Sequence, residues 1–306
     1  MTVELIVPLL AAAIQSGTPI LYATLGEILT EKSGVLNLGV EGMMITGALA
    51  AFVTALATGQ PVLAFLVGGI SGAAVGAIHA VVCLWFLGNQ VVSGLALTIF
   101  GLGLANYLGT PLIGQTAPGF DKLSVPLLHH LPVLGPIVFQ QDILVYVAIL
   151  LVPLLWFFLD KSRWGLHLRA AGEHPEAAAA AGIGVLRYRW LGILGGGCLV
   201  GFGGSYLSLA YTHLWTNGLS AGRGWIAVAL VIFAFWRPER ALLGAYLFGG
   251  VMAFQLRLQA VGTHLPSSIL LMLPYLLTVV VLVLASWKSV RNAAPAALGV
   301  NMEPND

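Results

Sequence analysis

Several apolar stretches of the sequence contain single hydroxyl, amide or phenol side chains that could bind a polar solute. None carries a fixed charge, so together they suit a neutral molecule held by hydrogen bonds and ring stacking. The same groups could instead bond neighbouring helices to each other, and the residues alone leave both interpretations open. Not all of them can face one cavity, because Ser93 and Asn106 lie thirteen positions apart on one expected helix. The candidates for a substrate path are Gln90, Ser93, Asn106, Tyr206, Tyr211 and Gln255.

Two carboxylates and an amide form a second polar group near the first turn of the chain. Ionisable groups inside a membrane are costly and usually functional. Glu27 would lie near the inner end of the first span and Glu41 about one turn into the second, which favours a structural role: capping, or a pair with Lys32. Asn37 and Glu41 are spaced i, i+4 and would share one helical face in a polar network. No acid follows until residue 121, which argues against a proton relay.

The sequence lacks the motifs of a chain that hydrolyses ATP or a peptide bond by itself. It contains no G-x-x-x-x-G-K-[ST] loop, no Gly-Lys pair and no H-E-x-x-H. The pair His129-His130 is more typical of ordinary surface residues than of a metal site. Cys83 and Cys198 lie in apolar segments, so we expect no disulfide. We therefore expect no metal, no cofactor and no enzymatic activity from this chain alone.

The elements that must position these side chains are membrane-spanning helices. Only 8% of the 306 residues are charged and 58% are hydrophobic, whereas a soluble domain has about 25% charged residues. The excess apolar surface must face lipid, and a net charge of +1 gives no hint of a nucleic-acid partner. We predict an all-α, polytopic transmembrane bundle. Nine spans are favoured, with eight or ten possible, at about 4–29, 37–59, 62–87, 91–109, 143–159, 191–213, 225–236, 241–261 and 267–286.

Two sets of glycines and one short span indicate where helices pack or break. Gly68, Gly72 and Gly76 recur every fourth residue, which predicts a close-packing face on the third span. The glycines of segment 195–204 allow either a bend or a close approach around a cavity. Segment 225–236 is short for a span and would be tilted or broken.

The positive charges orient the chain. Residues 161–190 hold five of the thirteen Lys and Arg residues, and cytoplasmic loops carry such an excess. With this loop inside, the N-terminus lies outside and the C-terminus inside, and the proline-rich loop 110–142 lies outside. We expect residues 1–290 to form a single transmembrane domain and residues 291–306 to form a disordered cytoplasmic tail.

The middle of the inner loop predicts a short helix outside the bilayer. Pro175 suits the first turn of a helix, and five alanines, 177–181, favour its continuation. Gly182 and Gly184 then end it. A smooth alanine face flanked by cations suits insertion into a groove on another protein, although a solvated connector would have the same composition.

Three segments resemble the permeases of ATP-binding-cassette (ABC) importers for branched-chain amino acids, ribose and other simple sugars, and nucleosides. The segments are GEILTEKSGVLNLGVEGMMITGA (26–48), NQVVSGLALTIFG (89–101) and GLHLRAAGEHPEAAAAAGI (165–183). The first two are most similar to the nucleoside and simple-sugar branch. Glu31-Lys32 stands where glutamate-arginine is usual in that branch.

The resemblance implies a type II-like importer permease in the bacterial plasma membrane, surrounded by lipid. Its partners would be ABC ATPase subunits, a second permease (a copy or a paralogue) and an extracytoplasmic substrate-binding protein. A coupling helix would dock into the ATPase. By resemblance that role falls on Arg169, Ala170, Gly172, Glu173, Pro175, Glu176, Ala178, Ala179 and Gly182.

Three alternatives remain beside a nucleoside or sugar importer. A permease for branched-chain amino acids would share the same resemblance. A stand-alone secondary transporter would need an ion site at mid-membrane, which the acid-poor spans disfavour. A membrane-embedded enzyme or assembly factor would need clustered catalytic groups.

Overall fold

The computed structural model describes residues 3–126, 128, 131–262, 266–287 and 294–301. Within these residues the chain is helical with no β-strand, only two isolated β-bridges, which confirms the all-α prediction. The pair His129-His130 lies outside the described residues. The longer helices are α1 (Val3–Lys32), α2 (Val40–Thr58), α3 (Pro61–Ala80), α4 (Gln90–Gly109), α6 (Ile143–Lys161), α9 (Val185–Tyr206) and α11 (Pro238–Ala260).

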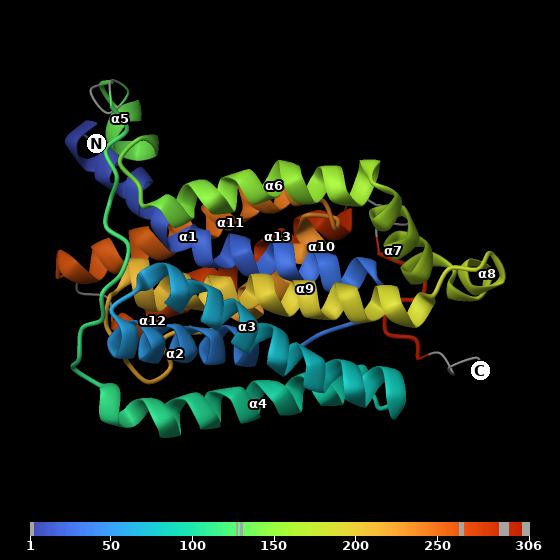
Figure 1. Cartoon of the computed structure of the whole chain (residues 1–306). Coiled ribbons are helices and arrows are strands. Elements are labelled where there is room, and N and C mark those ends of the chain that lie inside the picture. The colour runs from blue at the N-terminus through green and yellow to red at the C-terminus, as the bar shows by residue number, and fades with distance from the viewer. Residues whose placement is uncertain (1–2, 127, 129–130, 263–265, 288–293, 302–306) are drawn as a thin grey trace.

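Shorter elements complete the bundle (Figure 1). Two π-helical turns extend α3 and α9, and a 3-10 turn follows α4. The shorter helices lie in the loops or form incomplete spans. These elements are η1 (Val81–Trp85), η2 (Thr110–Leu112), α5 (Leu134–Val138), α7 (Arg163–Glu173), α8 (Pro175–Ala180), η4 (Leu207–Tyr211), α10 (Arg223–Phe233), α12 (Ser267–Leu271) and α13 (Leu273–Trp287).

Seven helices in the described part of the chain are long and apolar enough to cross a membrane. They correspond to seven of the nine expected spans. The other two, near 225–236 and 267–286, are the short helix α10 and the pair α12–α13, which is interrupted at Met272. The short seventh span was expected from its length, and α10 is indeed only 11 residues long.

Glycines let the central helices approach closely. A side chain at Gly72 of α3 would meet the carbonyl of Gly197 and the backbone of Gly201, both on α9. Likewise, Gly47 of α2 lies against Gly201. The predicted close-packing face of α3 is therefore confirmed, and the glycines of α9 allow close approach of backbones.

The two ends of the bundle differ in composition. We call them the α8 end, with α7, α8 and the chain's C-terminal part, and the α5 end, with α5 and the N-terminus (Figure 1). The α8 end collects most of the cations. These cations lie on α7 or at the ends of α1, α6, α9 and α11 that meet it, and they are Lys32, Lys161, Arg163, Arg169, Arg187, Arg189, Arg237 and Arg240.

Helix α2 begins beside the middle of α4 rather than at the α8 end of the bundle. After α1 ends at Lys32, residues 33–39 continue as non-helical chain along α4. The amide of Leu36 donates to the Gln90 side chain at the first residue of α4 (2.7 Å). Farther along, Gly42 packs on Leu97 and Thr98, in the middle of α4. Irregular backbone at membrane depth is stable only when buried in protein, and here α4 and its neighbours cover it.

The C-terminal segment differs from the expectation. Residues 294–301, which we call the C-terminal strap, form turns and hydrogen bonds with the α8 end. The prediction of disorder is therefore wrong for these residues. The prediction failed because the strap is held through backbone amides and one asparagine, and amino-acid composition does not show that such groups have partners. Residues 291–293 and 302–306 lie outside the described residues.

Candidate functional site

The N-termini of two helices meet in the middle of the bundle, at Glu41. This residue lies in the first turn of α2, and its carboxylate accepts three hydrogen bonds from the start of α10. The Ser220 hydroxyl donates to Oε1 (2.6 Å), the Gly222 amide to Oε1 (2.9 Å) and the Gly224 amide to Oε2 (2.7 Å). The first amides of a helix have no partner within the helix, and its dipole favours an anion there. Glu41 therefore caps α10 across a long sequence separation.

Arg223, the first residue of α10, places a buried cation beside this cap. Its Nη1 donates to the carbonyls of Leu219 (3.4 Å) and Ser220 (3.2 Å). The guanidinium lies over the ring of Tyr211, 5.4 Å from its centroid, an arrangement that stabilises a cation. The Nε of Arg223 is buried without a hydrogen-bond partner. A buried donor of this kind is costly when unpaired, so it would favour an acceptor on a bound molecule.

Aromatic hydroxyls surround the same junction, which we call the α2–α10 junction (Glu41, Tyr211, Ser220, Arg223 and Tyr275). The Tyr211 hydroxyl shares a hydrogen bond of 3.1 Å with the Ser16 hydroxyl of α1. The Tyr275 hydroxyl of α13 lies directly against Gly222. Phenol rings, hydroxyls and one guanidinium can bind a polar solute through hydrogen bonds and ring faces.

The six residues predicted for a substrate path do not share one site. Gln90 and Ser93 lie toward the α8 end, where Ser93 bonds to the His79 ring (2.9 Å). Near the α5 end, the Asn106 side chain accepts from the Gly218 amide (3.0 Å).

Tyr206 is buried and donates to Asp142 at the start of α6 (3.1 Å). Gln255 is buried within α11. Only Tyr211 belongs to the α2–α10 junction. Most of the other candidates form hydrogen bonds with neighbouring segments, which was the alternative to a substrate path.

The predicted polar network divides in two. Asn37 donates to Glu27 (3.3 Å) and accepts from the amide of Gly39 (2.9 Å), so these two residues do form a pair. Glu41 is not part of this pair, and the predicted common helical face of Asn37 and Glu41 is wrong, because residues 34–39 are not helical. Of the two structural roles expected for Glu41, the structure shows capping, at the start of α10, and not the pair with Lys32.

Sequence reasoning missed three members of the α2–α10 junction, which are Ser220, Arg223 and Tyr275. Arg223 is the first residue of α10, whose start is held by Glu41 of α2. Ser220 lies in the run GLSAG (218–222), which has the G-x-S-x-G spacing of a hydrolase nucleophile. The motif requires a strand before the serine, and the residues before Ser220 form turns instead. The Ser220 hydroxyl donates to Glu41 rather than to a histidine. Outside the junction, sequence reasoning also missed Glu31, which accepts a hydrogen bond from the Trp236 indole.

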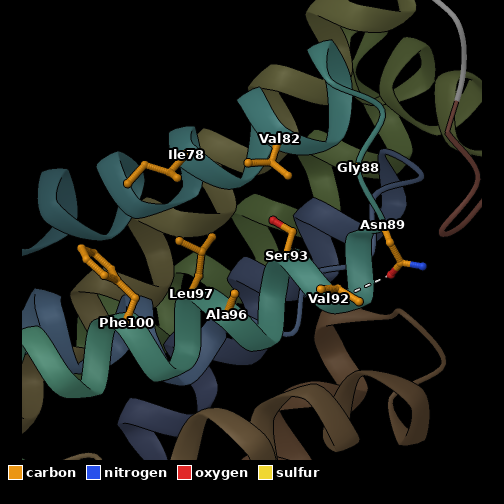
Figure 2. A pocket seen from close by; sticks show the side chains of 9 residues that line it. All are labelled: Ile78, Val82, Gly88, Asn89, Val92, Ser93, Ala96, Leu97 and Phe100. Carbon is orange, nitrogen blue, oxygen red and sulfur yellow. Dashed lines mark hydrogen bonds between the residues drawn. The ribbon is translucent and has the colours of Figure 1, made fainter.

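An apolar groove of about 530 Å³ lies between α3 with η1 and α4 (Figure 2). Its only polar side chains belong to Asn89, which caps α4 through the Val92 amide, and Ser93, which is bonded to His79. The remaining lining is Ile78, Val82, Gly88, Val92, Ala96, Leu97 and Phe100. Because its polar groups already have partners, this groove offers little to a polar solute.

The loop at the α8 end contains the predicted short helix. Helix α8 covers Pro175–Ala180, with Pro175 in its first turn as expected. Gly182 follows with φ +78°, a conformation that glycine adopts readily, and its amide bonds to Ala179 (2.9 Å). Helix α7 before it was not predicted; Ser162 caps it by accepting from the Gly165 amide (2.9 Å).

Burial separates the residues predicted for coupling into two groups. Gly172, Pro175 and Ala178 are buried, and their role in coupling stays a prediction. Gly172 packs against Lys32 and Gly34, at the end of α1. The other members are partly or fully exposed: Arg169, Ala170, Glu173, Glu176, Ala179 and Gly182. Ala177, Ala180 and Ala181 are exposed beside them and form, with Glu176 and Gly182, what we call the α8 face.

Comparison with known proteins identifies the family of the chain. Residues 9–285 match the family model described as branched-chain amino acid transport system / permease component. The chain is 44% identical to a putative glucose ABC transporter permease protein of Haloferax volcanii, with 95% of each chain covered. It is 36% identical to a nucleoside ABC transporter permease protein of Lactococcus lactis, with 93% of each chain covered. A guanosine ABC transporter permease protein of Bacillus subtilis is 32% identical, with 92% of each covered.

No solved structure matches the chain. The matched family model spans nearly all of the helical bundle, and the relatives align over nearly their whole length. The chain is therefore a multi-pass plasma-membrane protein, and it belongs to the permease family of branched-chain amino acid transport systems.

Proposed function

We propose that this chain is the membrane-spanning permease subunit of an ATP-driven importer for nucleosides or simple sugars. The names of its relatives support this substrate class, since they concern glucose, nucleosides and guanosine. ATP hydrolysis would occur on a separate ATPase subunit, because this sequence has no phosphate-binding loop. A substrate-binding protein would deliver the solute, and a second permease would complete the pathway.

The observation that carries the proposal is the exposed α8 face at the cation-rich end of the bundle. Cytoplasmic surfaces carry the excess of Lys and Arg, so the α8 end faces the cytoplasm in this proposal. An exposed helix of alanines there suits a groove on a soluble ATPase. The opposite, α5 end would then meet the substrate-binding protein, through loop 110–142.

The α2–α10 junction is the candidate passage for the solute. Eleven residues of α10 rise about 16 Å, roughly half of a bilayer core of about 30 Å. Two helices that begin at half depth leave polar groups where a continuous span would have none. Transporters bind solutes at such broken helices. The carboxylate of Glu41 is occupied by α10, which leaves Arg223 and the tyrosines to meet a neutral, hydroxyl-rich molecule.

A continuous path of contacts joins the α8 face to this junction. Helix α8 follows directly on α7, and Gly172 of α7 packs on Lys32 and Gly34. Residues 33–39 then lead to Glu41, which holds the start of α10. Movement of α8 by an ATPase would thus be transmitted along the chain to the junction, and ATP binding would bias a two-state equilibrium between outward and inward access.

Reconstitution tests the proposal. The permease, its ATPase and the substrate-binding protein would be placed in proteoliposomes, and uptake of labelled guanosine, glucose and leucine would be measured with and without ATP. We expect ATP-dependent uptake of guanosine or glucose. Uptake of leucine alone would instead support a branched-chain amino acid permease, and uptake without ATPase would indicate a secondary transporter.

A further inference from the structure

The C-terminal strap crosses the α8 end and joins segments that are otherwise separate. At its beginning, the amide of Ala296 donates to Glu173 (3.1 Å) and that of Ala297 to the carbonyl of Gly172 (3.0 Å). Both acceptors belong to the last turn of α7. Ala297 is only 7% exposed, and Leu298 packs against the main hydrophobic core. The strap is therefore docked by burial as well as by hydrogen bonds.

Its middle binds the turn after α1 and the start of α9. The Gly299 amide donates to the carbonyl of Gly34 (3.3 Å). Nη1 of the buried Arg189 donates to the carbonyl of Val300 (3.0 Å). Nε and Nη2 of Arg189 are buried without partners, so the Val300 carbonyl is an important acceptor for this cation.

Its last described residue, Asn301, binds the beginning of α4. Asn301 Nδ2 donates to the carbonyls of Leu87 (2.6 Å) and Gly88 (3.0 Å), while its Oδ1 accepts from the side chain of Gln90 (2.9 Å). The same Gln90 accepts from the amide of Leu36 in the irregular segment that leads to Glu41. All hydrogen-bonding groups of the Asn301 amide face α4 or the turn before it.

We propose that the C-terminal strap is a coupling element, with Asn301 as a positioning residue that ties α4 and residues 33–39 to α7. This inference rests on the proposed function, since it assigns the strap to the transmission of ATPase movement. The strap contacts the last turn of α7, the turn after α1 and the start of α4 within eight residues. A displacement of α7 would therefore draw the inner end of α4 with it. Without the strap, α7 could move while α4 stays in place.

The test compares import with ATP hydrolysis in the complete reconstituted transporter. Asn301→Ala removes the side-chain bonds to Leu87, Gly88 and Gln90. We expect the amount of solute imported per ATP hydrolysed to fall about fivefold, the effect of losing about one net hydrogen bond from a two-state equilibrium. The ATPase rate and the amount of ATPase that copurifies should stay unchanged. Truncation before residue 294 should give at least the same loss.

Val300→Ala is the matched control, because it changes an exposed side chain and keeps the backbone carbonyl that Arg189 binds. It should import normally. Normal import per ATP by both Asn301→Ala and the truncated chain would overturn the proposal. A parallel loss of copurifying ATPase would also overturn it, because the strap would then serve assembly. If the unaltered transporter shows no ATP-dependent uptake of guanosine or glucose, the proposed function itself fails, a result distinct from either of these.

Discussion

Replacement of Glu41 tests whether the α2–α10 junction is held as described. Ser220 and Gly222 donate to Oε1 and Gly224 donates to Oε2. In Glu41→Gln the amide nitrogen must face the backbone amide of either Gly222 or Gly224, whichever way the group is turned. One buried donor then loses its acceptor, which costs about 1–3 kcal/mol of unfolding free energy. Glu41→Ala removes every acceptor and should cost about 3–5 kcal/mol.

The assay is reversible unfolding in mixed micelles of increasing denaturing-detergent content, followed by tryptophan fluorescence. The matched control is Glu239→Gln, because Glu239 makes an exposed pair with Arg237 at 3.7 Å. Surface pairs of this kind contribute about 0–1 kcal/mol. If Glu41→Gln and Glu239→Gln lower stability equally, or Glu41→Ala costs no more than Glu41→Gln, Glu41 does not cap α10.

Three further predictions concern the α8 face, the helix packing and the orientation. Ala177→Trp on the α8 face should leave ATP hydrolysis intact and lower import several-fold, so normal coupled import would count against docking there. Gly72→Ala should destabilise the bundle by about 1–3 kcal/mol, because the added methyl group would meet the backbone of α9. Gly103→Ala is the control and should be neutral, because its methyl group would meet no atom within 4 Å. Equal losses of stability in the two variants would contradict the close packing of α3 on α9. Glu176→Cys should react with an impermeant maleimide only from the cytoplasm, and labelling from outside would reverse the proposed orientation.

Local chemistry predicted much of the architecture. Hydropathy located the long spans because each is a continuous apolar helix, and the spacing of Gly68, Gly72 and Gly76 predicted a packed face. Helix α8 was also predictable, since Pro175 suits the first turn of a helix and the alanines after it favour its continuation. These features depend on neighbouring residues, which a single sequence displays.

Features that depend on distant contacts were not predictable in this way. Residues 33–39 are apolar enough to continue a span, and only the packing of Gly42 on α4 shows that α2 begins beside the middle of that helix. Arg223 lies beside the start of α2 because Glu41 binds the amides of Gly222 and Gly224 on either side of it. The C-terminal strap is docked by backbone groups, whose partners the sequence does not reveal. In each case, the determining contact joins residues far apart in the chain.

The cap on α10 also constrains how the protein is made. The donors of Ser220, Gly222 and Gly224 lie 179 to 183 residues after Glu41. At a synthesis rate of about 5–20 residues per second, the carboxylate exists for roughly 9 to 36 s before its partners leave the ribosome. An unpaired carboxylate is costly in hydrocarbon, so the start of α2 would stay near the aqueous surface during that time. Insertion of this segment would then be completed only after translation of α10, which makes biogenesis of the first spans dependent on the second half of the chain.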